Sequence, residues 1–147
     1  MTETADEKHF DAWMGLKNSL HQTGKMRSFH EGEVWWCALG ENVGIEINGK
    51  SRSFARPVII LKKLSRYGFQ GIPLTSQPHT GSWYVHFKFQ GKDEYAVLSQ
   101  MRTFSVSRLY QRMGRVDEED LEVIKSQFHD LYCTNHTPSV GRKTTAR

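Results

Sequence analysis

Hydrophobic residues recur with helical spacing near both ends of the chain and with strand spacing between them. The N-terminal pattern predicts an amphipathic helix over residues 5–21, with acids at positions 3, 6 and 7, where the positive end of a helix dipole favours them. The C-terminal pattern predicts a second helix that begins after a capping Asp117. Its apolar stripe consists of Leu121, Ile124, Phe128 and Leu131.

Short runs rich in β-branched and aromatic residues lie between the two helices. They predict strands over residues 33–39, 57–63, 67–74, 83–89 and 95–99, with long loops at 40–55 and 76–81. Residues 104–115 are ambiguous: 107–113 fit a helical turn, and 113–116 fit a brief final strand. Strands of this length and spacing predict a mainly β fold, a small antiparallel barrel with one helix at each end.

The length of 147 residues predicts one domain with terminal extensions. We expect an N-terminal helical extension and connector at 1–30, the barrel with its C-terminal helix at 31–132, and a basic, disordered tail at 133–147. The two cysteines lack metal-binding spacing, which favours reduced thiols. No apolar run approaches the ~18 residues of a membrane span, and the start is unlike a signal peptide, so we expect a cytoplasmic protein without a membrane partner.

Charge is distributed unevenly along the chain, although the formal net charge is only +4. Residues 47–92 contain no Asp or Glu but eight Lys or Arg and two His. Such segregation favours an anionic partner, with an affinity that falls as salt rises. The alternative is an ordinary solvated basic face.

Two segments of this basic stretch place polar chemistry at the end of a predicted strand. Arg56 precedes Pro57, which holds it in an extended conformation at a strand entrance, where a guanidinium can bind a phosphate bidentately. Thr75 and Ser76 end the next strand, and their hydroxyls can donate to a phosphate or cap the local backbone. Together these groups suit a phosphodiester.

Other side chains are candidates for proton transfer or base stacking. Glu46, His79 and His86 are possible proton-transfer groups. Glu46 is equally explained as an exposed glutamate, whereas His86 alternates with apolar neighbours and is better explained as a residue on the polar face of its strand. Phe54, Trp83 and Tyr84 can stack on unpaired bases or pack in the core. The seven histidines are scattered and no nucleotide-binding loop is present, so a reaction without metal or nucleotide cofactor remains.

Six short blocks occur in the order and spacing of one family: 32–36 (GEVWW), 44–46 (GIE), 56–60 (RPVII), 73–76 (PLTS), 98–100 (LSQ) and 113–116 (MGRV). Over about residues 31–130 the chain resembles the MazF/PemK/Kid family of toxin ribonucleases. The predicted N-terminal helix lies outside this resemblance.

The resemblance implies an SH3-like (CcdB/PemK-type) barrel that forms a homodimer and is neutralised by a cognate antitoxin. It also implies a metal-independent endoribonuclease of the mRNA interferase type, which cuts single-stranded RNA by attack of the ribose 2′-hydroxyl and leaves 2′,3′-cyclic phosphate and 5′-hydroxyl ends. Arg56 then matches the arginine at the scissile phosphate, Thr75 with Ser76 beside it the group that stabilises the phosphorane, and Glu46 the loop acid.

Several positions depart from the family pattern. Ile45 and Ile47 stand where its loop motif has serine and glutamine, and Ser99 stands where some members have an aspartate, so the general base is open. A non-catalytic SH3-like binding module, or a CcdB-like poison that acts by binding, is therefore the alternative. The predicted RNA-binding residues are Lys50, Arg52, Gln77, His79, Ser99, Gln100 and Arg102.

The N-terminal helix has two possible roles. It can pack Phe10 and Trp13 on the barrel and shape the groove of a dimer, or it can serve as a structural cap.

Overall fold

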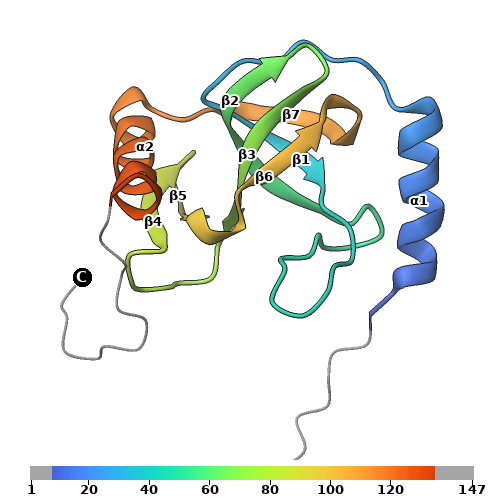
Figure 1. Ribbon diagram of the computed structural model, residues 1–147, viewed down its shortest axis with the longest axis horizontal. Helices are drawn as coiled ribbons and strands as arrows, with labels where there is room; N and C mark the ends of the chain where they lie inside the picture. The colour runs from blue at the N-terminus through green and yellow to red at the C-terminus, as the bar shows by residue number, and fades with distance from the viewer. Residues whose placement is uncertain (1–7, 135–147) are drawn as a thin grey trace, which may run out of the picture.

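Seven antiparallel strands form one curved sheet in the computed structural model, which describes residues 8–134 (Figure 1). The strands are β1 (Glu33–Ala38), β2 (Ala55–Ser65), β3 (Gly68–Thr75), β4 (Tyr84–Phe89), β5 (Lys92–Val97), β6 (Arg102–Ser105) and β7 (Leu109–Arg115). Their order is β4-β5-β3-β2-β1-β7, and β6 pairs with the first half of β3. Among the described residues β4 and β7 do not pair, so the predicted mainly β, antiparallel barrel is confirmed in an open form.

Both sides of β2 are buried, which explains its continuous apolar run. Val58 and Ile60 face one core cluster together with Phe69 and Phe104, whereas Ile59 faces the other. A strand that is covered on both faces does not show polar alternation. Arg56 stands at the start of this strand, so its backbone is fixed by the most deeply buried part of the fold.

Helix α2 (Glu118–Tyr132) covers the second core cluster and confirms the predicted stripe. Leu121 and Ile124 are fully buried beneath the helix, and Phe128 and Leu131 are partly buried. Asp117 occupies the N-cap position, but its side chain makes no capping hydrogen bond. The first turn carries Glu118, Glu119 and Asp120, whose negative charges suit the positive end of the helix dipole.

Helix α1 (Phe10–Thr23) lies at the opposite end of the molecule from α2 (Figure 1). The predicted start at residue 5 falls outside the described residues, and positions 8 and 9 are not helical. Trp13 is buried against Ala38 and Phe54, and its ring lies so close to Gly40 that a Cβ there would overlap it. Phe10 is 44 % exposed, so the expectation that it packs on the barrel is wrong.

The ambiguous segment 104–115 is mostly strand, and the expected helical turn over 107–113 is wrong. A single 3₁₀ turn, η2 (Val106–Arg108), joins β6 to β7. The predicted brief strand at 113–116 is the end of β7, which pairs with β1 through two register shifts. These strands are short and carry many exposed side chains, so the apolar pattern that reveals a strand is missing.

Both cysteines are free, as expected. Burial raises the pKa of the Cys37 thiol to about 12, whereas Cys133 is exposed. Almost all of the predicted disordered tail lies outside the described residues. Within residues 8–134, no helix has the length and apolar character needed to cross a membrane.

Trp13 provides a test of how α1 is attached. We expect Trp13→Ala to lower the free energy of unfolding by about 3–5 kcal/mol, because it removes the aromatic side chain that joins the helix to the barrel. Phe10→Ala on the same helix is the control and should cost less than ~0.5 kcal/mol. Urea unfolding measures both values, and equal losses would contradict this account of the packing.

Glu33 makes the stability of the fold pH-dependent. Burial raises its pKa, but hydrogen bonds from Arg112, the His30 amide and the Trp35 indole outweigh burial, so the pKa lies below 4.5. A carboxyl group with a lowered pKa stabilises the folded state above its unfolded pKa, and this contribution is lost as the pH falls through the folded pKa. We expect the unfolding free energy of Glu33→Gln to fall less steeply between pH ~5 and ~2 than that of the parent chain. Parallel slopes in denaturant titrations over that range would contradict the prediction.

Candidate active site

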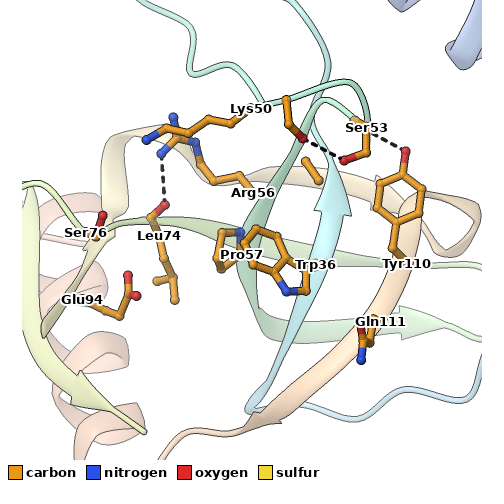
Figure 2. A pocket seen from close by; sticks show the side chains of 12 residues that line it. Trp36, Lys50, Ser53, Arg56, Pro57, Leu74, Ser76, Glu94, Tyr110 and Gln111 are labelled. Carbon is orange, nitrogen blue, oxygen red and sulfur yellow. Dashed lines mark hydrogen bonds between the residues drawn. The ribbon is translucent and has the colours of Figure 1, made fainter. Parts of the chain in front are cut away.

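Arg56 is held at the start of β2 by neutral acceptors. Its Nε donates to the Asn48 carbonyl at 2.8 Å, and its Nη1 donates to the Leu74 carbonyl at 3.4 Å. No salt bridge within residues 8–134 joins Arg56 to a carboxylate. Figure 2 shows the guanidinium at the rim of a pocket, next to the end of β3. The guanidinium is thus oriented without being neutralised.

Burial lowers the pKa of Arg56, because it penalises the charged form. An arginine remains protonated at neutral pH even so, since its ordinary pKa is above ~12. The site therefore carries a fixed, partly desolvated positive charge. An anion that binds there interacts more strongly than it would with a fully hydrated lysine.

Two pockets flank the end of β3, and Arg56 lines both. The large pocket has a volume of about 540 Å³, and its walls include Trp36, Pro57, Leu74, Ser76, Glu94, Tyr110 and Gln111 (Figure 2). The small pocket has a volume of about 240 Å³ and is lined by Ile45, Ile47, Arg56, Thr75, His79, Tyr84, Val97 and Gln100.

Thr75 and Ser76 line different pockets. Successive side chains of an extended segment point to opposite sides, and Thr75 lines the small pocket while Ser76 lines the large one. Thr75 is only 8 % exposed, and its Oγ1 accepts a hydrogen bond from the Gln77 amide at 3.2 Å. The local capping that the sequence suggested is therefore present, and it leaves the hydroxyl proton of Thr75 available to donate.

Glu46 lies outside both of these pockets. It lines a third pocket, the loop pocket, of about 410 Å³, together with Ser99, Arg102 and other residues. Its Oε1 accepts from the Val43 amide at 3.1 Å, which closes a turn in the loop between β1 and β2. The structure therefore brings Thr75 and Ser76 to Arg56 but does not bring Glu46 there.

Gln100 fixes the middle of the same loop from the outside. Its Oε1 accepts from the Ile47 amide at 3.1 Å, and its Nε2 donates to the Ile45 carbonyl at 3.0 Å. Both isoleucines stand where the family pattern has polar residues. Because isoleucine side chains cannot form hydrogen bonds, Gln100 binds the loop through the backbone groups of Ile45 and Ile47. Gln100 lines both the small pocket and the loop pocket and forms the boundary between them.

The other predicted RNA-binding residues differ in whether their side chains line a pocket. His79 lies flat on Tyr84, with ring centroids 4.4 Å apart, and both line the small pocket, whereas Lys50 lines the large pocket. Arg52 is exposed on the loop, and Gln77 contributes its backbone amide to Thr75.

The remaining aromatic candidates are engaged elsewhere. His86 is held by Asp93 at 2.8 Å, Trp83 contacts Tyr132 edge-on, and Phe54 is buried under Trp13. Within residues 8–134 no group of three or more His, Cys, Asp or Glu side chains is placed to hold a metal ion.

Sequence reasoning missed the acid of the large pocket, Glu94. The pairing of β3 with β5 ends at Thr75 opposite Tyr95, so Glu94 lies alongside Ser76, and both line the large pocket. Burial raises the pKa of Glu94, although nearby Lys92 lowers it. The signal that could have revealed Glu94 is this strand register, which the sequence does not specify.

Gln100 gives a test of the loop. Gln100→Ala removes both amide contacts, and we expect amide hydrogen exchange of residues 41–49 to accelerate by about 5–30-fold, equivalent to ~1–2 kcal/mol for two hydrogen bonds. Gln70→Ala is the matched control, because it removes a side-chain hydrogen bond to Thr103 on the sheet surface. Unchanged exchange in the loop would show that Gln100 does not hold it.

Comparison with known proteins gives a family and a fold. Residues 30–132 match the sequence model of the PemK-like, MazF-like toxins of type II toxin-antitoxin systems. No curated protein sequence matches the chain significantly.

Three solved structures illustrate the similarity of fold. A crystal structure of MazF from Deinococcus radiodurans has a TM-score of 0.62 and 17 % identity and covers 74 % of this chain and 99 % of that one. An endoribonuclease in complex with its cognate antitoxin from a Mycobacterial species has a TM-score of 0.56, 18 % identity and coverages of 70 % and 93 %. A MazE–MazF crystal structure from Deinococcus radiodurans has a TM-score of 0.56, 14 % identity and coverages of 71 % and 95 %. At these identities the similarity shows the fold alone.

Proposed function

We propose that this chain, which belongs to the family of PemK-like, MazF-like toxins of type II toxin-antitoxin systems, is an endoribonuclease that cuts single-stranded RNA. The observation that carries the proposal is the Arg56 guanidinium, oriented by two backbone carbonyls and not neutralised by any described carboxylate. A hydroxyl donor lies on each side of the strand end beside it. A positive charge with neighbouring hydroxyl donors is the set of groups that binds a phosphodiester. An arginine with a purely structural role would not require hydroxyl donors beside it.

The proposed reaction is an internal transesterification. The ribose 2′-oxygen forms a bond to phosphorus and loses its proton to a base, the bond from phosphorus to the 5′-oxygen breaks, and the 5′-oxygen takes up a proton. The products are a 2′,3′-cyclic phosphate and a 5′-hydroxyl. Negative charge grows on the phosphoryl oxygens in the transition state, where Arg56 and a hydroxyl donor stabilise it.

This electrostatic arrangement supports a reaction that needs no metal or cofactor. A positive charge at the scissile phosphate is what a divalent ion supplies in other nucleases, and Arg56 supplies it here. Activity that persists in EDTA is the corresponding measurement. Loss of activity in EDTA, restored by a divalent ion, would overturn this part of the proposal.

Glu46 is the proposed loop acid of the reaction, and its position sets a condition. Its carboxylate is engaged with the Val43 amide in the loop pocket. For Glu46 to accept the 2′-hydroxyl proton, the loop between β1 and β2 has to rearrange when RNA binds. The same condition favours the second candidate, a binding module that retains RNA without cutting it. Cyclic phosphate ends on the products support the nuclease, whereas salt-sensitive retention of intact RNA supports the binder.

The proposed partners follow from the family and the charge. The solved toxins of similar fold include complexes with an antitoxin, and we propose a cognate antitoxin for this chain as well. We further propose a homodimer whose basic faces form the RNA-binding groove, acting in the cytoplasm, where its RNA substrate is found.

Arg56 is the first test. We expect Arg56→Ala to lower kcat/KM on a long unstructured RNA by at least about 10²-fold, since one transition-state donor of this kind is worth ~3–4 kcal/mol. Arg56→Lys keeps the charge but loses the paired donors, and we expect it to recover only part of the activity. Arg66→Ala is the matched control, because it removes an exposed arginine in the turn between β2 and β3, which lines none of the three pockets. Unchanged turnover in Arg56→Ala would show that the active site lies elsewhere.

The two hydroxyls provide a second test, because they line different pockets. Thr75 is held by the Gln77 amide with its proton free to donate, so we expect Thr75→Val to lower kcat/KM by about 10–100-fold. Ser76→Ala should change it by less than ~3-fold, since no described contact orients the Ser76 hydroxyl. The reverse ranking would place the scissile phosphate on the side of the large pocket.

A further inference from the structure

The large pocket combines apolar walls with one acid. Trp36, Pro57, Leu74 and Tyr110 line it, and Glu94 lies at the end of it formed by β5. Trp36 is 39 % exposed although it is a tryptophan on a central strand. An exposed aromatic wall beside a bound phosphate is typical of sites where an unpaired base stacks.

The position of the pocket relative to Arg56 suits the nucleoside next to the scissile phosphate. Arg56 lines the pocket at its rim, and Figure 2 shows the Glu94 carboxyl group at the other end, with Leu74 between them. A phosphate at Arg56 therefore leaves room for its attached sugar to direct a base inward. The volume of about 540 Å³ is ample for a purine.

The Glu94 carboxylate has no hydrogen-bonding partner among the described residues. It accepts no hydrogen bond and forms no salt bridge, and the cation that affects it, Lys92, does so only through its charge. A partly buried carboxylate without donors is costly, and its two oxygens can accept two parallel N–H bonds. Guanine offers two adjacent N–H donors on its Watson–Crick edge, at N1 and N2. Uracil offers one, and adenine and cytosine each offer a single amino group.

We propose that the large pocket holds an unpaired guanine base adjacent to the phosphate bound by Arg56, and that Glu94 selects guanine by accepting its two N–H groups. This rests on the proposed function, because it takes RNA as the ligand. It deepens that function by assigning a specificity-determining residue and a preferred base.

Charge and position exclude other roles for Glu94. A segment of an acidic antitoxin would bring its carboxylates against Glu94, which is unfavourable in a pocket with apolar walls. Proton transfer at the scissile phosphate requires a carboxylate close to Arg56. No salt bridge in the described part of the chain joins Glu94 to Arg56.

The first experiment sequences the cut ends of a randomised RNA pool. For the parent chain we expect guanine to be enriched at one position adjacent to the cut. In Glu94→Gln and Glu94→Ala the preference for guanine there should fall by about 10–100-fold, the value of one good bidentate contact. Preferences at other positions should stay. Glu122→Gln, at an exposed carboxylate of α2, is the matched control and should cut like the parent chain. Identical profiles for the parent chain and Glu94→Gln, or no guanine preference in the parent chain, would overturn the proposal.

The second experiment separates this proposal from the nuclease itself. The probe is an uncleavable 2′-O-methyl oligouridine with one central guanosine, compared with the same probe carrying inosine, which lacks the N2 amino group. We expect the full-length protein to bind the guanosine probe about 5–10-fold more tightly, and this difference to disappear in Glu94→Gln. If RNA is not cut but the two probes are distinguished, the pocket assignment stands and the nuclease proposal fails. Equal affinities for the two probes overturn the pocket assignment even if RNA is cut.

Discussion

The candidate active site depends on the Arg56 guanidinium, which backbone carbonyl groups hold in place. Asn48 and Leu74 fix two nitrogens of Arg56 without neutralising them. A carboxylate partner would have oriented the side chain equally well, but it would have competed with any incoming phosphate. Because residues 47–92 contain no acid, no carboxylate from β2, from β3 or from residues 47–54 of the adjoining loop can take that place, and Glu46 of that loop accepts from the Val43 amide instead. The uneven charge along the chain thus has a local purpose at Arg56.

The fold supports this contact from three sides. β2 carries Arg56 and is fixed by burial on both faces, and β3 supplies the Leu74 carbonyl at its end. Asn48 lies in the loop between β1 and β2, which Gln100 holds in the middle. Trp13 covers Gly40 and Phe54 at the base of that loop. The first helix lies outside the region that matches the family, so this chain has an additional element that supports the base of its site loop.

The fold was largely predictable from the sequence, whereas the details of the site were only partly so. The core strands and α2 have strong apolar patterns, because burial on a face or stripe imposes a period on the sequence. β6 and β7 lack such a pattern, so β6 was missed and only the end of β7 was predicted. That Arg56 and Thr75 share a pocket was expected from the two strand ends. The division of Thr75 and Ser76 between two pockets follows from strand geometry. The position of Glu46 depends on how the long loop between β1 and β2 folds back, and no local sequence pattern specifies that. Glu94 enters the site only through the register of β5 against β3, which the sequence also does not specify.

The distribution of acids around the site separates affinity from selectivity. Contacts to the phosphate backbone give affinity without reading sequence, and base contacts in a desolvated pocket give selectivity. The acid-free segment ends at Lys92, and the second acid after it is Glu94, which lines the large pocket and forms no salt bridge with Arg56 among the described residues. A carboxylate next to the phosphate would repel the substrate. At the far end of an apolar pocket, the carboxylate repels only ligands that carry negative charge, and it disfavours ligands that lack N–H donors. On our proposal, carboxylates are therefore absent where the RNA backbone would bind and present where a base would be recognised. Under the proposed function, this placement allows a chain of modest net charge to attract RNA of any sequence and still discriminate among the bases that it holds.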